Sequence, residues 1–171
     1  MCKIGVFVAI TTVFAQVNIP ISYGVPITLQ TLAILLAGIV LGPKNGTLVA
    51  LIYVLLGIVG IPVFTGFTGG IGILFSRTGG FILAFPFVAF TAGIGSKRDS
   101  YLWQLCWLVS GIIVLFTSGL LMFSFITSNS LVVSFSLVVA PFIPAEIIKI
   151  VVAMVLSKVI IKALSKGGVA V

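Results

Sequence analysis

Six apolar segments, separated by short clusters of polar residues, glycine and proline, constrain the fold of this chain more than any other feature. Their approximate limits are residues 4–17, 28–42, 46–63, 79–95, 101–126 and 131–164. A membrane-spanning helix needs about 20 apolar residues to cross about 30 Å of hydrocarbon. The hydrophobic content of 61% and mean hydropathy of +1.44 exceed what a soluble core of 171 residues could bury. We therefore predict an all-α integral membrane protein, a single domain over residues 1–171 folded as a six-transmembrane-helix bundle with ordered outer loops.

Two details refine this prediction near the N-terminus. The segments 4–17 and 28–42 are short for a bilayer, so we expect them to pack inside the bundle or below longer neighbours. The run from Gly42 to Gly46 (GPKNG) favours a tight turn and therefore a helical hairpin. The first segment also has the pattern of a signal peptide, but because it is equally suited to a first span we expect it to be retained.

The positions of Lys and Arg predict the orientation in the cell membrane. With both termini in the cytoplasm, seven of the nine cations fall on the inner side, as the positive-inside rule requires. They are Lys3, Lys44, Lys97, Arg98, Lys158, Lys162 and Lys166. The two others, Arg77 and Lys149, map to the outer half, whereas Asp99 belongs to the inner loop beside Arg98.

Several function classes are excluded by composition. The chain has no histidine and only two acidic residues, Asp99 and Glu146, so it lacks the groups of the common hydrolytic sites and of histidine-rich metal sites. Cys2 and Cys106 have no metal-type or redox-type spacing. The cations are dispersed between apolar segments and do not form a nucleic-acid-binding stripe. We expect no enzyme, no metal, no cofactor and no nucleic-acid partner.

Glu146 and Lys149 are the chain's most unusual residues, because an acid and a base lie three positions apart in an apolar run. An ionisable pair at membrane depth indicates a functional site by default. The pair could recognise a polar ligand in an apolar pocket. It could also be a helix-start carboxylate neutralised by the lysine one turn later, or part of a proton relay, although no second acid is available to continue such a relay.

Glycine interrupts the apolar pattern between residues 61 and 81. This stretch has too many glycines for a helix and is too apolar for an exposed loop. Non-helical backbone at membrane depth must be buried in protein or line a cavity. The stretch therefore predicts a re-entrant lid or pocket wall whose backbone groups could bind a small polar ligand, with a plain connection as the alternative. It matches no phosphate-binding glycine motif.

Two further polar regions have open interpretations. Thr28 and Gln30, at the outer start of the second segment, could face the same cavity, or could cap the helix and meet solvent. Lys158, Lys162 and Lys166 form a basic face at the end of the last segment. This face is suited to anionic lipid or to a cytoplasmic partner.

Four segments in order carry a resemblance to a known family. They are Val25 to Lys44 (VPITLQTLAILLAGIVLGPK), Gly60 to Leu74 (GIPVFTGFTGGIGIL), Thr78 to Phe81 (TGGF) and Pro141 to Lys149 (PFIPAEIIK). The sequence is similar, from about Ala15 to Lys162, to the BioY family, the biotin-specific substrate-binding (S) components of energy-coupling factor (ECF) transporters. The resemblance implies a high-affinity biotin-binding subunit whose transport is energised by a separate transmembrane coupling subunit and two ATPase subunits. The alternatives are an S component for a different vitamin and a stand-alone ion-driven carrier.

The resemblance also implies a set of substrate-binding residues. The family pattern PxxPGDxxK supplies an acid and a lysine for the biotin head group; here Lys149 matches, Glu146 replaces the aspartate and Ala145 replaces the glycine. The family's GPTGG appears as residues 76–80 (SRTGG), and the added Arg77 could hold a ligand carboxylate or lie at the membrane interface. The expected substrate-binding residues are Glu146, Lys149, Arg77, Gln30, Thr28, Phe64, Phe67, Gly69, Gly70, Thr78, Gly79 and Phe81.

Overall fold

The protein is almost entirely helical. The computed structural model describes residues 2–98 and 100–166, so Asp99 lies outside the described residues. The elements in chain order are α1 (Cys2–Gln16), β1 (Asn18–Ile19), η1 (Ser22–Gly24), β2 (Ile27–Thr28), α2 (Gln30–Ile58), η2 (Ile71–Phe75), α3 (Gly79–Gly95), α4 (Tyr101–Thr127), α5 (Leu131–Val138), η3 (Ala140–Phe142) and α6 (Ile143–Lys166), where η marks a short 3₁₀ helix. The all-α class is confirmed. Among the described residues, α4 is long and apolar enough to cross a membrane, and α2 passes the same test only when its two parts are counted as one helix.

The backbone of α2 is broken at Gly42. Its φ of 79° and ψ of 175° are far from helical values, and Pro43 follows as the first residue of the next turn. A Cβ atom on Gly46 would meet the backbone of Gly38. Eight residues span about 12 Å along a straight helix, so this contact requires the chain to fold back. Residues 30–41 and 43–58 therefore form a helical hairpin closed by two facing glycines.

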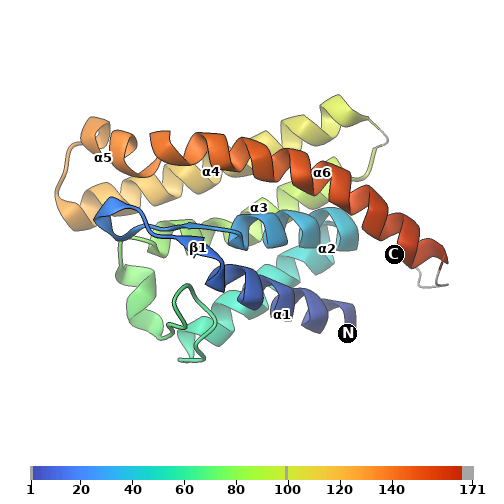
Figure 1. Cartoon of the computed structure of the whole chain (residues 1–171), viewed down its shortest axis with the longest axis horizontal. Helices are drawn as coiled ribbons and strands as arrows, with labels where there is room; N and C mark the ends of the chain where they lie inside the picture. The colour runs from blue at the N-terminus through green and yellow to red at the C-terminus, as the bar shows by residue number, and fades with distance from the viewer. Residues whose placement is uncertain (1, 99, 167–171) are drawn as a thin grey trace.

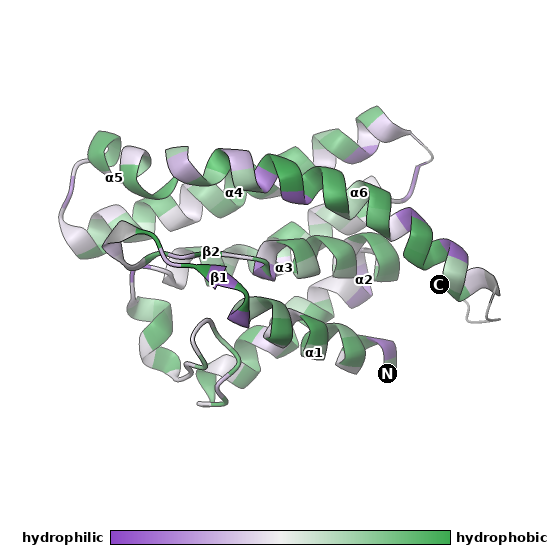
Figure 2. Ribbon diagram, viewed as in Figure 1, coloured by the Kyte–Doolittle hydropathy of each residue, from purple (hydrophilic) through white to green (hydrophobic). Residues whose placement is uncertain are grey.

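Small residues allow the central helices to pack closely. A Cβ on Gly38 would meet the backbone of Ala89 in α3, and one on Gly80 in α3 would meet the backbone of Ser118 in α4. The outer faces remain apolar, with Phe125 and Val132 largely exposed. Figure 2 shows that hydrophobic residues make up most of the helices. A helix that is apolar on every side is typical of membrane spans.

Both termini lie at one end of the bundle, together with the end of α3 and the start of α4 (Figure 1). The opposite end carries the irregular segments. There β1 pairs with β2 in an antiparallel ladder that closes the first loop. In the second loop, Phe64 and Thr68 form an isolated bridge. These paired loops form a structured cover over that end of the helices.

Two predicted helices differ from the structure. The helix expected over 46–63 ends at Ile58, because Gly60 adopts a left-handed φ of 99° and Pro62 follows. The single helix expected over 131–164 is divided into α5 and α6 by η3. Pro141 and Pro144 lack the N–H groups needed to continue α5, and both suit the first turns of new helices.

Candidate ligand-binding site

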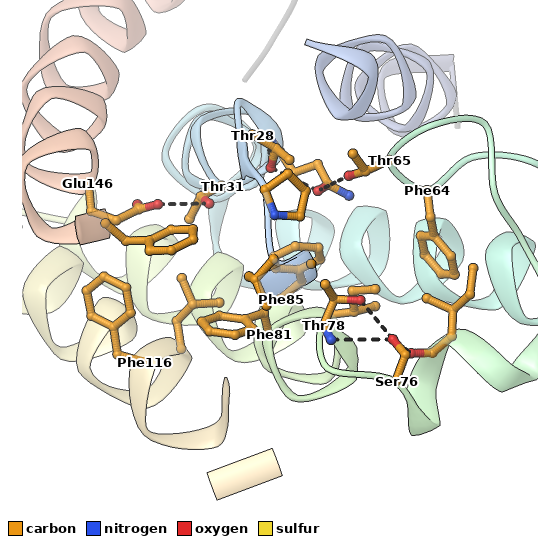
Figure 3. A pocket seen from close by; sticks show the side chains of 18 of the residues that line it. Thr28, Thr31, Phe64, Thr65, Ser76, Thr78, Phe81, Phe85, Phe116 and Glu146 are labelled. Atoms are coloured by element: carbon orange, nitrogen blue, oxygen red, sulfur yellow. Dashed lines mark hydrogen bonds between the residues drawn. The ribbon is translucent and has the colours of Figure 1, made fainter. Parts of the chain in front are cut away.

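A cavity of about 350 Å³ lies below the loop-covered end of the bundle. Its volume falls in the range of small-molecule sites. The first loop, the 60–78 loop and helices α2, α3, α4 and α6 all contribute to it (Figure 3). Its lining comprises Gly24, Val25, Pro26, Thr28, Gln30, Thr31, Phe64, Thr65, Thr68, Ile73, Ser76, Thr78, Phe81, Ile82, Phe85, Leu115, Phe116, Phe142, Glu146 and Lys149.

Glu146 and Lys149 form the charged side of this cavity. Lys149 Nζ donates to Glu146 Oε1 at 2.5 Å, and the Thr31 hydroxyl donates to the same oxygen at 3.2 Å. Both charged residues are about 95% buried. The other carboxylate oxygen, Glu146 Oε2, is buried and has no hydrogen-bond partner among the described residues. The site therefore holds one satisfied oxygen and one open acceptor beside an ammonium group.

The start of α6 positions this pair. Pro141 in η3 and Pro144 in α6 redirect the chain, so Glu146 falls in the first turn of α6 and Lys149 one turn later on the same face. A carboxylate in the first turn is stabilised by the helix macrodipole. Burying an ion pair carries a desolvation penalty that its attraction does not reliably offset. A ligand-binding role gives a reason for burying this one.

Gln30 organises the second polar side of the cavity. Its amide oxygen accepts from the hydroxyls of Thr28 and Thr65, at 2.9 and 3.0 Å. Its amide nitrogen donates to the Tyr53 hydroxyl at 2.6 Å. The Tyr53 hydroxyl in turn donates to the Val63 carbonyl at 2.9 Å. The network ties the start of α2 to the 60–78 loop. Buried polar groups satisfied in this way fix a single arrangement.

Two aromatic walls rest on glycines of neighbouring helices. Phe64 covers Gly57, and Phe81 covers Gly119 so closely that a Cβ on either glycine would overlap the ring. Phe81 also stacks on Phe142, with ring centroids 6.4 Å apart. In Figure 3, Phe81 and Phe85 lie between the Glu146 side and the Ser76 side of the cavity. The middle of the cavity is therefore apolar, with polar groups towards its two sides.

Side chains outside the cavity hold the covering loops in place. Gln16 donates to the Phe64 carbonyl at 3.1 Å and accepts from the Phe67 backbone N–H at 3.0 Å. Arg77 is exposed and donates from Nη1 to the Tyr23 carbonyl at 3.2 Å. That contact joins the first loop to the segment before α3. Gly24, next to Tyr23, lines the cavity.

The predicted binding residues divide into two groups. Glu146, Lys149, Gln30, Thr28, Phe64, Thr78 and Phe81 line the cavity. The remainder, which are Arg77, Phe67, Gly69, Gly70 and Gly79, lie outside its lining.

Local structure explains why three residues of the second group, Phe67, Gly69 and Gly79, lie outside the cavity lining. Phe67 is 72% exposed on the loop tip. Gly69 lies against the backbone of residues 60–61, and Gly79 against the backbone of Leu74 in η2. Close backbone contacts of the loop itself require these two glycines. Their expected contact with a ligand stays a prediction.

Several lining residues were not among the predicted binding residues. They are Thr31, Thr65, Thr68, Ser76, Phe85, Phe116 and Phe142. Thr31, Thr65, Thr68, Ser76 and Phe142 lie in segments that resemble the family, so the resemblance could have indicated them. Phe85 and Phe116 are aromatics within apolar runs outside those segments, and only the packing of α3 and α4 distinguishes them from lipid-facing residues.

Comparisons with known proteins identify the family. The model of the BioY family matches residues 1–166. The chain belongs to the BioY family. The "Probable biotin transporter BioY" of Pyrococcus horikoshii is 42% identical over 156 residues, covering 91% of each chain. The "Biotin transporter BioY" of Thermotoga maritima is 36% identical over 158 residues, covering 92% of each.

A solved structure agrees with this BioY assignment. A crystal structure of the S component for biotin from an ECF-type ABC transporter matches with a TM-score of 0.84 at 29% identity. The match covers 94% of this chain and 89% of the other. The resemblance stated from the sequence is confirmed. The named BioY relatives are transporters, which also confirms the prediction of a transport protein and not an enzyme.

Proposed function

We propose that this chain is a biotin-binding S component of an ECF transporter. The single observation that carries the proposal is the open Glu146 Oε2 acceptor beside Lys149 in an aromatic cavity. The BioY membership supplies the substrate class, since its matched relatives are named for biotin.

Biotin offers groups that complement this cavity. Its ureido ring has two N–H donors and one carbonyl. One N–H donates to Glu146 Oε2, and the carbonyl accepts from Lys149, whose ammonium has further hydrogens beyond the one directed at Glu146. The sulfur-containing ring packs among Phe81, Phe85 and Phe116. The carboxylate tail then reaches the hydroxyl-bearing side, where Ser76 and Thr78 are hydrogen bonded to each other at 3.0 Å.

The proposed orientation has six membrane-spanning segments with both termini in the cytoplasm. In support, the two halves of α2 count as two segments and α5 with α6 as one. Both termini are at one end, and the binding cavity is near the other. The positive-inside rule assigns the cation-rich end to the cytoplasm. Biotin would then enter from outside.

Energy for transport is assigned to partner proteins in this proposal. A transmembrane coupling subunit and two ATPase subunits would use ATP, while this chain binds the vitamin and its loops close over it. In support, the glycine-rich loop has no phosphate-binding motif. The proposal therefore requires uptake to depend on those partners.

A competition assay separates biotin from other vitamins. Purified chain is loaded with labelled biotin, and unlabelled biotin, lipoate, thiamine or riboflavin is added. Lipoate is the matched control because it has the same acid tail and a sulfur ring but no ureido group. We expect only biotin to displace the label at equimolar concentration. Displacement by a different vitamin at lower concentration would assign the chain to that vitamin.

An uptake assay separates the S component from an ion-driven carrier. Biotin uptake is measured in cells expressing the chain with or without the coupling and ATPase subunits. We expect uptake only with the partners, and we expect it to persist when a protonophore collapses the ion gradient while ATP is maintained. Uptake by the chain alone that stops with the protonophore would establish the carrier instead.

A further inference from the structure

A second cavity, of about 420 Å³, lies at the end of the bundle where the termini are. It lies between the last turns of α6, the residues that follow α3, and the start of α4. Figure 2 shows hydrophilic residues on α6 near the C label. Arg98, Lys158 and Lys162 are its charged side chains, and Gln104, Ser96, Ser157 and Ser165 are its neutral polar ones. No carboxylate lines it within residues 2–98 and 100–166.

The three cations of this cavity are not neutralised by salt bridges within the described part of the chain. The Arg98 guanidinium lies over the Trp103 ring at 4.2 Å, and Lys158 Nζ lies over the Tyr101 ring at 3.6 Å. Such ring contacts orient a cation without removing its charge. Lys162 is one turn from Lys158 on the same face of α6. The cavity therefore presents concentrated positive charge.

Gln104 adds neutral donors to the same cavity. It is only 8% exposed, and its side-chain amide has no hydrogen-bond partner among the described residues. The amide atoms of Gln104 are accessible from the cavity and not sealed within the protein, so they are free to hydrogen bond to a ligand there. An amide N–H₂ together with a guanidinium and two ammonium groups matches the oxygen atoms of a phosphate. The lining thus indicates a phosphate-bearing ligand.

The surrounding surface favours a lipid as the source of that phosphate. Leu102 on α4 and Val155 and Val159 on α6 are each at least 60% exposed, and they lie within about a turn of the cations. Lipid acyl chains contact such surfaces in a membrane, so a phospholipid can place its phosphate in the cavity while its chains lie against the adjacent apolar side chains. We propose that this cavity binds the phosphate group of an anionic phospholipid at the cytoplasmic face of the membrane. The inference rests on the membrane orientation proposed above and is independent of biotin.

Native mass spectrometry of the full chain tests this inference. The chain is reconstituted with equal amounts of phosphatidylglycerol and phosphatidylcholine of the same acyl length, and the retained lipid is measured. The variants are Lys158→Gln/Lys162→Gln and Gln104→Leu, with Lys44→Gln as the control cation outside the cavity. Each juxtamembrane charge contributes about 1 kcal/mol, so we expect the double variant to lose about 25-fold of the preference for phosphatidylglycerol.

Gln104→Leu keeps every charge and therefore tests the cavity itself. We expect it to lower the preference for phosphatidylglycerol severalfold, while Lys44→Gln leaves that preference within twofold.

Equal losses in Lys44→Gln and the double variant would overturn the proposal in favour of general surface attraction. Inorganic phosphate bound through the same lysines without anionic lipid would overturn the lipid source. A double variant that keeps the lipid preference but loses its coupling subunit would establish a protein-docking surface instead. Unchanged biotin binding shows that the variants are folded.

Discussion

The two oxygen atoms of the Glu146 carboxylate have different partners, and this difference is the basis of the proposed recognition. Oε1 is held by Lys149 and Thr31, while Oε2 is open. A carboxylate with one fixed oxygen cannot rotate freely. It therefore offers its second oxygen in a defined direction, which lowers the entropic cost of binding an N–H donor.

Lys149→Met tests the stability of the pair. It leaves the buried Glu146 carboxylate without its cation, which costs about 3–5 kcal/mol when a buried pair is broken. We expect the melting temperature to fall by roughly 10 °C. The double variant Glu146→Gln/Lys149→Met removes both charges, so its melting temperature should return to that of the wild type or above. A double variant less stable than Lys149→Met would contradict this view of the pair.

Thr31→Val tests the positioning of the carboxylate. Valine has nearly the same shape but cannot donate to Glu146 Oε1, and a hydrogen bond to a charged group contributes about 1.5–3 kcal/mol. We expect biotin affinity, measured by titration, to fall about 10-fold or more. Thr11→Val is the matched control, because the buried Thr11 hydroxyl bonds only within α1, to the Phe7 carbonyl. Equal losses in both variants would indicate a nonspecific effect of removing a hydroxyl.

At the scale of elements, glycines determine where the aromatic walls stand. Gly57→Ala would place a methyl group inside the Phe64 ring, so the ring must leave its position between the cavity and Tyr53. Such overpacking costs about 1–3 kcal/mol. We expect lower thermal stability and weaker biotin binding together. Gly5→Ala is the control, since no atom lies within 4 Å of its added Cβ and alanine favours helix. If Gly57→Ala keeps both its thermal stability and its biotin affinity, the described packing of Phe64 on Gly57 is contradicted.

Arg77→Gln tests how the two covering loops are held together. The Arg77 to Tyr23 contact joins the loops, so its removal should raise the dissociation rate of biotin about 2- to 10-fold, the range of a single hydrogen bond. The same factor is expected for biotinamide, whose tail is uncharged. A faster release of biotin but not of biotinamide would instead assign Arg77 to the ligand carboxylate, the alternative that the sequence left open.

Sequence patterns predicted the helices better than the loops between them. Long apolar runs specify helices such as α3. Its limits in the structure, 79–95, are the same as those predicted from the sequence. The break between α5 and α6 was missed because Pro141 and Pro144 are compatible with either a kinked helix or two helices. Gly69 and Gly79 were predicted to contact ligand, but glycine patterns do not reveal whether a ligand or the chain's own backbone makes the close approach.

At the scale of the molecule, polar groups are concentrated at the two ends of an apolar bundle. The cavity at the loop-covered end carries Glu146 and Lys149, and the cavity beside the last turns of α6 carries three cations. The sequence predicted the first, since an ionisable pair in an apolar run is rare. For the second cavity, the sequence predicted only the basic face on α6. Arg98 and Gln104 reach this cavity through the tertiary packing of α3, α4 and α6, which the sequence pattern does not reveal.

Equilibrium titration of biotin and lipoate into the purified chain tests the central claim most directly. It is done for the wild type and for Glu146→Gln/Lys149→Met. This double variant is expected to stay stable, because it leaves no buried charge without a partner. Two charge-assisted hydrogen bonds, at about 1.5–3 kcal/mol each, predict that the wild type prefers biotin by roughly 100-fold or more and that the double variant loses this preference. A folded wild type that binds biotin no more tightly than lipoate, or a double variant with wild-type affinity for biotin, would contradict the account.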